Sequence, residues 1–593
     1  MRKVAAIVEK QKCHPDSCQH ECMKYDPVNK SGGEGFHLGE SGKSEISEEV
    51  VTEMHKICAK KCPFGAIHII NLPEKLNEPP IHSYGKNSFE LFALPIVKQN
   101  TVIGIIGRNG IGKSSALQIL TGNVKPNLGE YKKSVEQEKI IERYSKVALG
   151  EYFKKLFSNN VKISYKPQRV ELLTTIYKGH TAIELLKKID ETGKSEALLK
   201  ELGIYEISDR KIEQLSGGEL QRIAIIAAAV KKAEVYYFDE PTSFLDITHR
   251  IKVAKLIREL AKEVSIVVVE HDLATLDYIS DEIQIVYGEP ACYGIFSQSK
   301  SVRRGINEYM EGMMPEENIR FRNYPIRFVE APEEIITSPE ILHEIESLEK
   351  NYDKFKLKTS PGKIHKGEVM AIMGSNGLGK TTFLKLLAGL EKPDNTEIKP
   401  LKLSYKPQYL NYDVQGTVES YLRISIGAEF LSGWFKTNIL EKLNLNSILQ
   451  NKISELSGGE LQKLYIVVAL CKPDIDLIAM DEPSAFIDVE DRLNVAEIIK
   501  DYVVMKGMSA IIVDHDIQFV DHLSDTMIVF EGLPGKEGHV YGPVPKREGM
   551  NRVLKNLDIT YRRDKLTGRP RINKPGSQLD QEQRHKGEYY YTA

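Results

Sequence analysis

The sequence predicts an α/β fold of two tandem nucleotide-binding domains, with a small cysteine-rich domain in front of them. Three observations lead to this prediction. A G-x-x-x-x-G-K-S/T loop occurs twice, at 107–114 and 374–381. Four other motifs recur behind each copy in the same order. Five of the seven cysteines lie between Cys13 and Cys62. A chain of 593 residues is long enough for three or more domains.

Each glycine-rich loop has the surroundings of a phosphate-binding loop. The loops follow apolar runs at 102–106 and 369–373 and precede helical patterns. In such an arrangement backbone N–H groups close around a phosphate, the Lys reaches the β- and γ-phosphates, and the hydroxyl meets Mg²⁺. The expected nucleotide-binding residues of the two loops are Gly107, Asn109, Gly110, Gly112, Lys113, Ser114, Ser115, Gly374, Asn376, Gly377, Gly379, Lys380, Thr381 and Thr382.

The other repeated motifs supply the parts for ATP hydrolysis. Y-K-P-Q, L-S-G-G-E-L-Q, D-E-P and H-D each occur once per half. An Asp that ends an apolar strand is suited to Mg²⁺, and the Glu after it is suited to polarise a water. We expect Mg²⁺ contacts from Ser114, Gln168, Asp239, Thr381, Gln408 and Asp481. We expect catalytic roles for Glu240, His271, Glu482 and His515.

The two halves stay in register except in one segment. Lys113 and Lys380 are 267 positions apart but Gln168 and Gln408 only 240, so the first half carries 27 extra residues. They fall near 131–160, where the sequence predicts a hairpin of two basic helices, the second amphipathic over 149–157. Such an insertion is either a partner-docking element or a plain surface hairpin.

Composition excludes several classes of protein. The net charge of −2 means that contact with nucleic acid must come from local patches. No apolar run approaches the roughly 18 residues that a membrane span needs, and the N-terminus has no signal-peptide pattern. Clustered cysteines without an export signal favour a metal or cluster site in a reducing compartment, so we expect a cytoplasmic protein. Cys292 and Cys471 are isolated and are expected to be packing residues.

The L-S-G-G-E-x-Q element resembles the signature of ABC ATPases. That resemblance implies that the signature of one half faces the ATP held by the other, so that Lys113 pairs with Ser457 and Lys380 with Ser216. Asp246 and Asp488 match the family's D-loop position at that interface. It adds Ser216, Gly217, Gly218, Glu219, Ser457, Gly458, Gly459 and Glu460 to the nucleotide-binding set. Tyr84, Phe89, Tyr352 and Phe355 precede the loops and either stack on adenine or pack in the core.

The N-terminal cysteines resemble those of a two-cluster ferredoxin. With the duplicated ATPase behind them, the chain resembles the ABC-E ribosome-recycling ATPases, also called the RNase L inhibitor family. R-G-I-N at 304–307 and G-R-P-R-I-N-K at 568–574 resemble the family's two hinges. The expected division is an iron–sulfur domain (1–75), a first ATPase domain (76–300), a hinge (301–340), a second ATPase domain (341–545) and a C-terminal hinge (546–593).

The sequence departs from the family at three cluster-ligand positions, which hold Asp26, Thr52 and His55. In two-cluster ferredoxins the fourth Cys of each run binds the other run's cluster. One [4Fe–4S] cluster then keeps all four ligands, Cys13, Cys18, Cys22 and Cys62, whereas the second keeps only Cys58. We expect one cluster and loss of the other, although Asp26, His55 and Cys58 would also suit zinc.

The resemblance implies an ATP-driven clamp that splits ribosomes into subunits and holds the small subunit. The implied partners are the small ribosomal subunit, ribosomal RNA and a termination or recycling factor, with no membrane and a monomeric chain. Residues 552–574 hold eight basic residues against two acidic ones, which is either a phosphate-contacting surface or a solvated charged face. The rival interpretations are an ABC-F translation factor, the ATPase subunit of an importer, and a redox enzyme.

Overall fold

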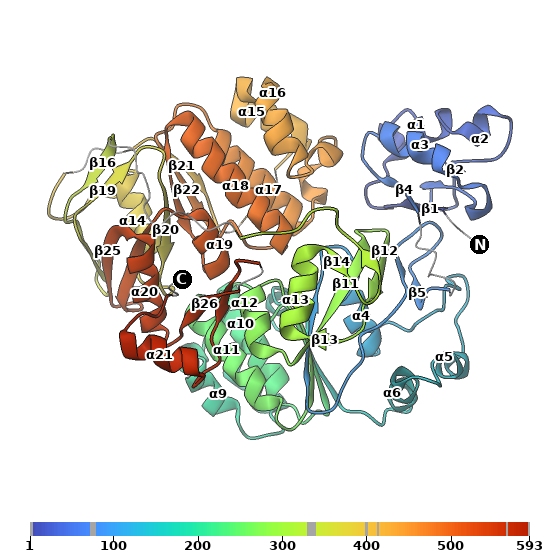
Figure 1. Ribbon diagram of the computed structural model, residues 1–593, viewed down its shortest axis with the longest axis horizontal. Helices are drawn as coiled ribbons and strands as arrows, with labels where there is room; N and C mark the ends of the chain where they lie inside the picture. Colours follow the sequence, from blue (N-terminus) through green and yellow to red (C-terminus); the bar gives the residue numbers. More distant parts are fainter. Residues whose placement is uncertain are drawn as a thin grey trace.

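The computed structural model describes residues 4–71, 79–328, 340–397, 401–408, 410–411, 414–564 and 567–590. It confirms an α/β fold with two tandem nucleotide-binding domains behind a small N-terminal domain (Figure 1). Parts of the predicted segments, at 1–3, 72–75, 329–339, 565–566 and 591–593, lie outside the described residues.

The N-terminal domain, drawn in blue in Figure 1, is held by a two-stranded antiparallel sheet. Its strands come from opposite ends of the domain, with Val4 opposite Asn71 and Val8 opposite Ile67. Between them the cysteine-bearing segments form short helices around a small core. The elements are β1 (Val4–Val8), α1 (Glu21–Lys24), α2 (Pro27–Lys30), β2 (His37–Leu38), β3 (Ser44–Glu45), α3 (Lys56–Lys61) and β4 (Ile67–Asn71).

The first ATPase domain is organised by a mixed sheet. Its central strands β7, β10 and β9 are parallel and fully buried, as their unbroken apolar runs predict. Within the described residues the strand order is β5 (His82–Ser83), β6 (Glu90–Leu91), β12 (Tyr293–Phe296), β11 (Glu282–Glu289), β7 (Val102–Ile106), β10 (Ser265–Val269), β9 (Val235–Asp239) and β8 (Ile163–Lys166), with β13 (Lys300–Ser301) beside β11. The division proposed at residue 300 falls inside β13.

The helices of the first domain cover this sheet and continue into the hinge segment. α4 begins at the phosphate-binding loop, and α13 packs against β11. The helices are α4 (Lys113–Leu120), α5 (Gln137–Arg143), α6 (Ala148–Phe157), α7 (Leu172–Ile176), α8 (Ala182–Ile189), α9 (Ser195–Glu201), α10 (Gly217–Ala229), α11 (Ile247–Leu260), α12 (Leu273–Ile279) and α13 (Val302–Glu311), followed by the hairpin β14 (Met313–Met314) and β15 (Ile319–Arg320).

The second ATPase domain repeats the sheet order of the first. Among the described residues it runs β17 (Glu349–Asn351), β18 (Lys356–Thr359), β25 (Glu537–Pro545), β24 (Thr526–Leu533), β20 (Val369–Met373), β23 (Ser509–Val513), β22 (Leu477–Asp481) and β21 (Leu403–Lys406), with β16 (Ile341–Ile345) and β19 (Gly362–His365) paired apart. Its helices are α14 (Lys380–Leu387), α15 (Val418–Ile426), α16 (Gly433–Phe435), α17 (Gly458–Cys471), α18 (Val489–Lys506), α19 (Ile517–Leu523) and α20 (Lys546–Asn556).

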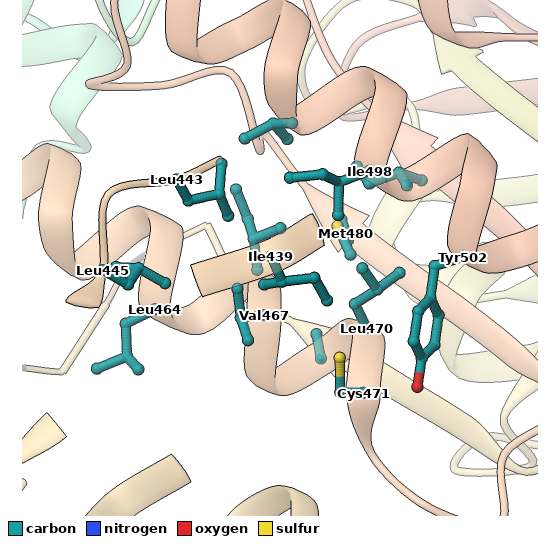
Figure 2. Close-up of a cluster of buried hydrophobic side chains, with 14 of the residues drawn as sticks. Ile439, Leu443, Leu445, Leu464, Val467, Leu470, Cys471, Met480, Ile498 and Tyr502 are labelled. Atoms are coloured by element: carbon teal, nitrogen blue, oxygen red, sulfur yellow. The ribbon is translucent and has the colours of Figure 1, made fainter. Parts of the chain in front are cut away.

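The core of the second domain fixes the helix that carries its signature. Figure 2 shows Ile439, Leu443 and Leu445, from a segment that includes a π-helix at Lys436–Glu441, packed against α17. Met480 of β22 and Tyr502 of α18 close the same cluster. The N-terminus of α17 is thereby positioned by the sheet beneath it. Cys471 lies buried in this core and Cys292 in a core of the first half, as expected of packing residues.

The chain ends in a segment that lies between the two halves. It contains β26 (Tyr561–Arg563), β27 (Pro570–Ile572) and α21 (Gln578–Lys586), and β27 contacts α12 of the first domain (Figure 1). Tyr561 and Ile572 pack in one core with residues from both ATPase domains, including Ile247 and Met550. This C-terminal segment therefore contributes to the packing between the two halves.

Candidate nucleotide-binding and hydrolysis sites

The two phosphate-binding loops have matching backbone geometry. Gly112 and Gly379 precede α4 and α14 with φ of 93° and 91°, a left-handed conformation that favours glycine. Lys113 Nζ and Lys380 Nζ each donate to the carbonyl oxygen of the loop's first glycine, both at 2.8 Å. Burial lowers the pKa of Lys113 to about 8. Each lysine is thus held at a helix N-terminus, which attracts a phosphate.

The aromatic residues before the loops divide into two kinds. The Phe89 and Phe355 rings pack on the loops, and a Cβ added to Gly112 would lie 2.6 Å from the Phe89 ring. Tyr84 and Tyr352 are exposed, by 49% and 43%. The Tyr84 hydroxyl donates to Ser115 Oγ at 3.0 Å. The packing interpretation therefore describes the phenylalanines, and the tyrosines lie open beside the loops.

Each glutamate that follows a strand-ending aspartate occupies a strained turn. Glu240 and Glu482 both have φ of 46°, which is uncommon for a residue other than glycine. Gln168 Nε2 donates to Glu240 Oε1, and Gln408 Nε2 to Glu482 Oε1, both at 2.7 Å. The structure therefore brings the predicted glutamine and glutamate of each half together.

Asp239 fits a magnesium ion. Both of its carboxylate oxygens are buried and meet no hydrogen-bond donor at standard geometry among the described residues. Burial, with the charge of Glu240, raises the pKa of Asp239 to about 6. An orphaned, buried carboxylate next to a phosphate-binding loop is suited to a bound cation and its waters. In the second half Asp481 accepts from the Tyr405 hydroxyl at 3.3 Å, and burial raises its pKa.

Two residues per half that bind the acidic turn were not assigned roles from the sequence. Lys166 Nζ donates to the carbonyl oxygen of Asp239 at 2.8 Å, and Gln221 Nε2 to that of Glu240 at 2.7 Å. Lys406 and Gln462 make the matching bonds to Asp481 and Glu482, both at 2.7 Å. All four lie at matching positions of the repeated motifs, and this recurrence could have identified them from the sequence. They fix the backbone that carries the carboxylates.

The environment of the glutamate differs between the halves. His271 Nε2 lies 3.4 Å from Glu240 Oε1, whereas His515 Nε2 lies 3.8 Å from Glu482 Oε1. Burial alone would raise the pKa of Glu240, but His271 and the nearby lysines lower it to about 2. Burial and the charges of Asp481 and Asp514 raise the pKa of Glu482 to about 7. Burial lowers the pKa of both histidines.

Each phosphate-binding loop lies against the opposite half. The Asn109 N–H donates to Asp488 Oδ2 at 3.3 Å, and the Asn376 N–H donates to Asp246 Oδ2 at 3.0 Å. A Cβ on Gly459 of the second signature would lie 3.9 Å from Asn109 Nδ2. Ser216 and Ser457 cap the signature helices α10 and α17. The geometry agrees with the reciprocal pairing that the ABC resemblance implies.

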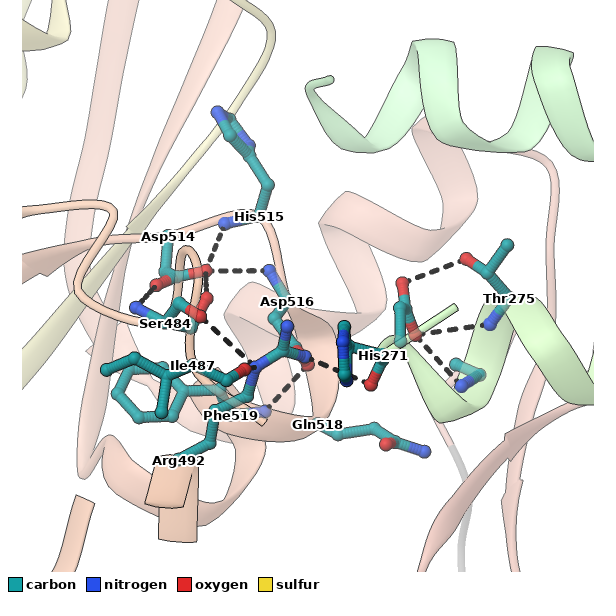
Figure 3. A network of polar contacts seen from close by, with 12 residues as sticks. His271, Thr275, Ser484, Ile487, Arg492, Asp514, His515, Asp516, Gln518 and Phe519 are labelled. Carbon is teal, nitrogen blue, oxygen red and sulfur yellow. Dashed lines mark hydrogen bonds and ion pairs between the residues drawn. The ribbon is translucent and has the colours of Figure 1, made fainter. Parts of the chain in front are cut away.

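A polar network joins the halves next to these loops (Figure 3). Arg492 of the second half donates to the carbonyl oxygen of His271 in the first half at 3.3 Å and to Asp516 Oδ2 at 2.5 Å. Arg250 of the first half binds Asp272 at 3.2 Å. The backbone of one candidate catalytic histidine is therefore held by a side chain of the other half.

The N-terminal domain gathers its five cysteines in one small core. Burial raises the pKa of Cys22 and Cys62, and the nearby Cys13 raises it further in both. Burial also raises the pKa of Cys18. Among the described residues no three His, Cys, Asp or Glu side chains lie close enough for a single metal ion. Cys13 and Cys18 both influence the pKa of Cys62, and Cys13 and Cys62 that of Cys22, so these four thiols lie near one another.

The position of the second cluster is filled by protein groups. Asp26, fully buried, accepts from the N–H groups of Val28 and Phe36, both at 2.7 Å. The Thr52 N–H donates to Nδ1 of the buried His55 at 3.1 Å, and His55 Nε2 lies 3.5 Å from Asp26 Oδ1. Asp26 therefore caps the helix that follows it, and Thr52 and His55 form the capping box of a second, short helix. These residues do not fit a second cluster.

The helical hairpin at 131–160 exists as predicted and packs on the first domain. Ile140 and Phe153 are fully buried, and the Tyr152 hydroxyl donates to the carbonyl oxygen of Leu120 at 2.6 Å. Its lysines Lys132, Lys133, Lys139, Lys154 and Lys155 are all exposed. The hairpin thus presents a basic surface on a fixed base.

Three of the C-terminal arginines differ from both expectations for 552–574. Arg563, Arg569 and Arg571 form neither a phosphate-contacting surface nor a solvated face, because they bind acids of the ATPase domains. Arg571 Nε donates to Asp277 of α12 at 2.7 Å, and Arg563 Nη2 to Asp521 of α19 at 2.9 Å. Arg569 is fully buried beside Asp277, 3.5 Å away. These basic residues join the two halves.

Comparison with known proteins agrees with this architecture. The ABC transporter family model matches residues 96–243 and 357–485, and the model described as "Possible Fer4-like domain in RNase L inhibitor, RLI" matches residues 5–34. Among the described residues, no helix is long and apolar enough to cross a membrane.

Relatives match over the full length. An uncharacterised ABC transporter ATP-binding protein of Methanocaldococcus jannaschii is 48% identical, over 99% of this chain and 97% of the relative. Translation initiation factor RLI1 of Saccharomyces cerevisiae is 41% identical, over 99% and 98%. A structure described as "Model of ribosome-bound archaeal Pelota and ABCE1" matches with a TM-score of 0.94 at 46% identity, over 100% and 99% of the two chains.

A further structure, of an archaeal ribosomal stalk protein with archaeal ribosome recycling factor aABCE1, matches with a TM-score of 0.81 at 47% identity, over 87% of this chain and all of that one. Identity above 40% over nearly the whole chain, shared with relatives that carry the same N-terminal domain, is decisive. The chain belongs to the ABC-E family, the RNase L inhibitor ATPases.

Proposed function

We propose that this protein is an ATP-driven ribosome recycling factor that splits ribosomes and holds the small subunit. The observation that carries the proposal is the full-length match to an ABCE1 chain described as ribosome-bound, including the N-terminal domain and the hairpin. The ATPase clamp alone would suit an ABC-F factor or an importer subunit.

ATP is the substrate of both composite sites in this proposal. Mg²⁺, when bound at Asp239 and Ser114 or at Asp481 and Thr381, neutralises phosphate charge. Glu240 and Glu482, aimed by Gln168 and Gln408, orient the attacking water and accept its proton. Lys113 and Lys380 stabilise the transferring phosphoryl group. Because each loop contacts the opposite half, ATP binding favours the closed clamp and hydrolysis releases it.

The N-terminal domain is placed to follow this motion. The Asn87 side chain of the first half donates to the carbonyl oxygen of Ala6 at 3.0 Å. Lys12 Nζ lies 3.3 Å from Glu460 of the second signature, and His14 lies 3.1 Å from Glu455. A domain attached to both halves moves when they move. In the proposed function it is the arm that separates the subunits.

The proposed partners follow from surface chemistry and from the relatives. The exposed lysines of the hairpin suit ribosomal RNA of the small subunit. Archaeal Pelota and an archaeal ribosomal stalk protein are the proteins named beside ABCE1 for the two matched structures. We expect the chain to act as a monomer, since both composite sites lie within one chain. We also propose that it acts in the cytoplasm.

Co-sedimentation with small ribosomal subunits tests the proposal. We expect stable binding with a non-hydrolysable ATP analogue and release with ADP. Equal binding without any nucleotide would contradict the ATP-driven clamp. A complete absence of ribosome binding, with ATPase activity intact, would contradict the recycling function.

We further propose that the protein carries one [4Fe–4S] cluster, bound by Cys13, Cys18, Cys22 and Cys62. Support comes from the Asp26 carboxylate and Nδ1 of His55, which accept hydrogen bonds from backbone N–H groups of the domain. Burial, with the charge of Asp26, raises the pKa of Cys58 to about 12, so this thiol is a poor lone ligand. Iron and acid-labile sulfide should each number about four per chain after anaerobic purification. About eight irons would contradict the proposal.

A further inference from the structure

The turn that carries the glutamate differs by one hydroxyl between the halves. The first half reads D-E-P-T-S-F at 239–244 and the second D-E-P-S-A-F at 481–486. Ser243 Oγ donates to Glu240 Oε2 at 3.1 Å. Its counterpart, Ala485, has no side-chain donor, and Glu482 Oε2 accepts no hydrogen bond from the described residues.

The backbone does not account for this difference. Both glutamates have φ of 46°, and the phenylalanines four residues later have φ of 64° and 62°. Thr242 and Ser484, the preceding residues in each turn, both bind the buried acid before the histidine, at 2.7 and 2.8 Å. The backbones of the two turns are therefore equivalent, and the Ser243 hydroxyl is a donor to the first glutamate that position 485 does not supply to the second.

We propose that Ser243 is a positioning residue for ATP hydrolysis at the first site, where it fixes the second carboxylate oxygen of Glu240. With Gln168 on Oε1 and Ser243 on Oε2, the carboxylate has one orientation toward the water. Glu482 is held through Oε1 alone and can rotate. The inference rests on the proposed function, in which Glu240 and Glu482 orient the attacking water.

Charged groups around each glutamate also influence its pKa, and they must stay the same when the Ser243 hydrogen bond is tested. Around Glu240 they are His271, Lys113, Lys166, Asp239 and Glu270. Around Glu482 they are His515, Lys380, Lys406, Asp481, Asp514 and, from the other half, Arg250. None of them changes in a serine–alanine exchange. A donor to the ionised carboxylate lowers its pKa, so a hydroxyl added at position 485 shifts the pH profile of the second site to lower pH.

The test isolates each site. In an E482Q chain, in which the first site alone turns over, S243A should lower kcat about fivefold. ATP affinity should stay unchanged, and S243T, which keeps the hydroxyl, should restore kcat. In an E240Q chain, A485S should raise kcat and move the acidic limb of kcat to lower pH.

An unchanged kcat for S243A would overturn the proposal, as would S243T behaving like S243A. Failure of the underlying function is recognised separately. If the E240Q/E482Q chain hydrolyses ATP like the wild type, the glutamates themselves are wrongly assigned. If that chain is inactive while S243A has no effect, only the positioning role fails.

Discussion

The two composite ATP sites are built from the same motifs on the same sheet order. Segments that occur only once in the chain nevertheless contact the two sites differently. Glu460, in the signature facing the first phosphate-binding loop, lies 3.3 Å from Lys12 of the N-terminal domain. Glu219, its counterpart facing the second loop, makes no ion pair among the described residues. The hairpin is also confined to one half. The single-copy segments thus distinguish the two copies further, in addition to the differences inside the sites such as Ser243 and Ala485.

The largest expected effect removes what the two sites share. The double variant E240Q/E482Q should bind ATP, remain closed, and lose ATPase activity by about 10²–10³-fold, because no acid remains to orient water. Steady-state phosphate release and nucleotide retention measure the two parts. Turnover close to that of the wild type would mean that the halves share some other base.

The next effect separates the sites by pH. In E240Q, kcat/KM should fall about tenfold per pH unit below about pH 7, because Glu482 must be ionised and its pKa is raised to about 7. In E482Q it should stay flat down to about pH 5, because the pKa of Glu240 is lowered to about 2. Identical pH profiles of kcat/KM for E240Q and E482Q would contradict this difference between the two sites.

A smaller effect concerns the insertion found in one half. Replacing exposed Lys139, Lys154 and Lys155 of the hairpin with alanine should weaken small-subunit binding about tenfold and reduce its salt dependence, with basal ATPase unchanged. The matched control replaces Lys436, Lys442 and Lys472, which are exposed on the second half. Equal losses in both triple variants would show a general charge effect.

The smallest expected effect concerns the N-terminal contact. K12A should speed amide exchange at 455–460 by about two- to fivefold, since a partly exposed ion pair contributes about 0.2–1 kcal/mol. K10A is the control, because Lys10 pairs with Glu45 inside the N-terminal domain. If both variants leave exchange at the signature unchanged, the first site is not distinguished by this contact.

Much of the fold could be predicted because its signals are local. The central strands are apolar runs that end in functional residues, and the amphipathic spacing at 149–157 corresponds to α6. The candidate site residues could be named because the motifs occur twice in the same order. Lys166 and Gln221 stood inside those motifs, but their bonds to backbone carbonyls depend on a turn that spacing does not reveal.

Long-range polar contacts could not be predicted. Arg569 and Asp277 are 292 positions apart, so a count of basic residues suggested an exposed surface where the structure has a buried ion pair. The sequence showed that Asp26 and His55 replace cysteines. Only the structure shows that both residues cap neighbouring helices.

The C-terminal segment affects how the two ATPase domains close again after they have opened. Asp277 and Asp521 occupy equivalent positions on α12 and α19, and one short stretch of chain grips both through Arg571 and Arg563. A tether of this kind makes each reclosure an intramolecular event with an effective concentration in the millimolar range. Nucleotide then has only to bias a local equilibrium, because the two half-sites never become independent molecules diffusing in solution.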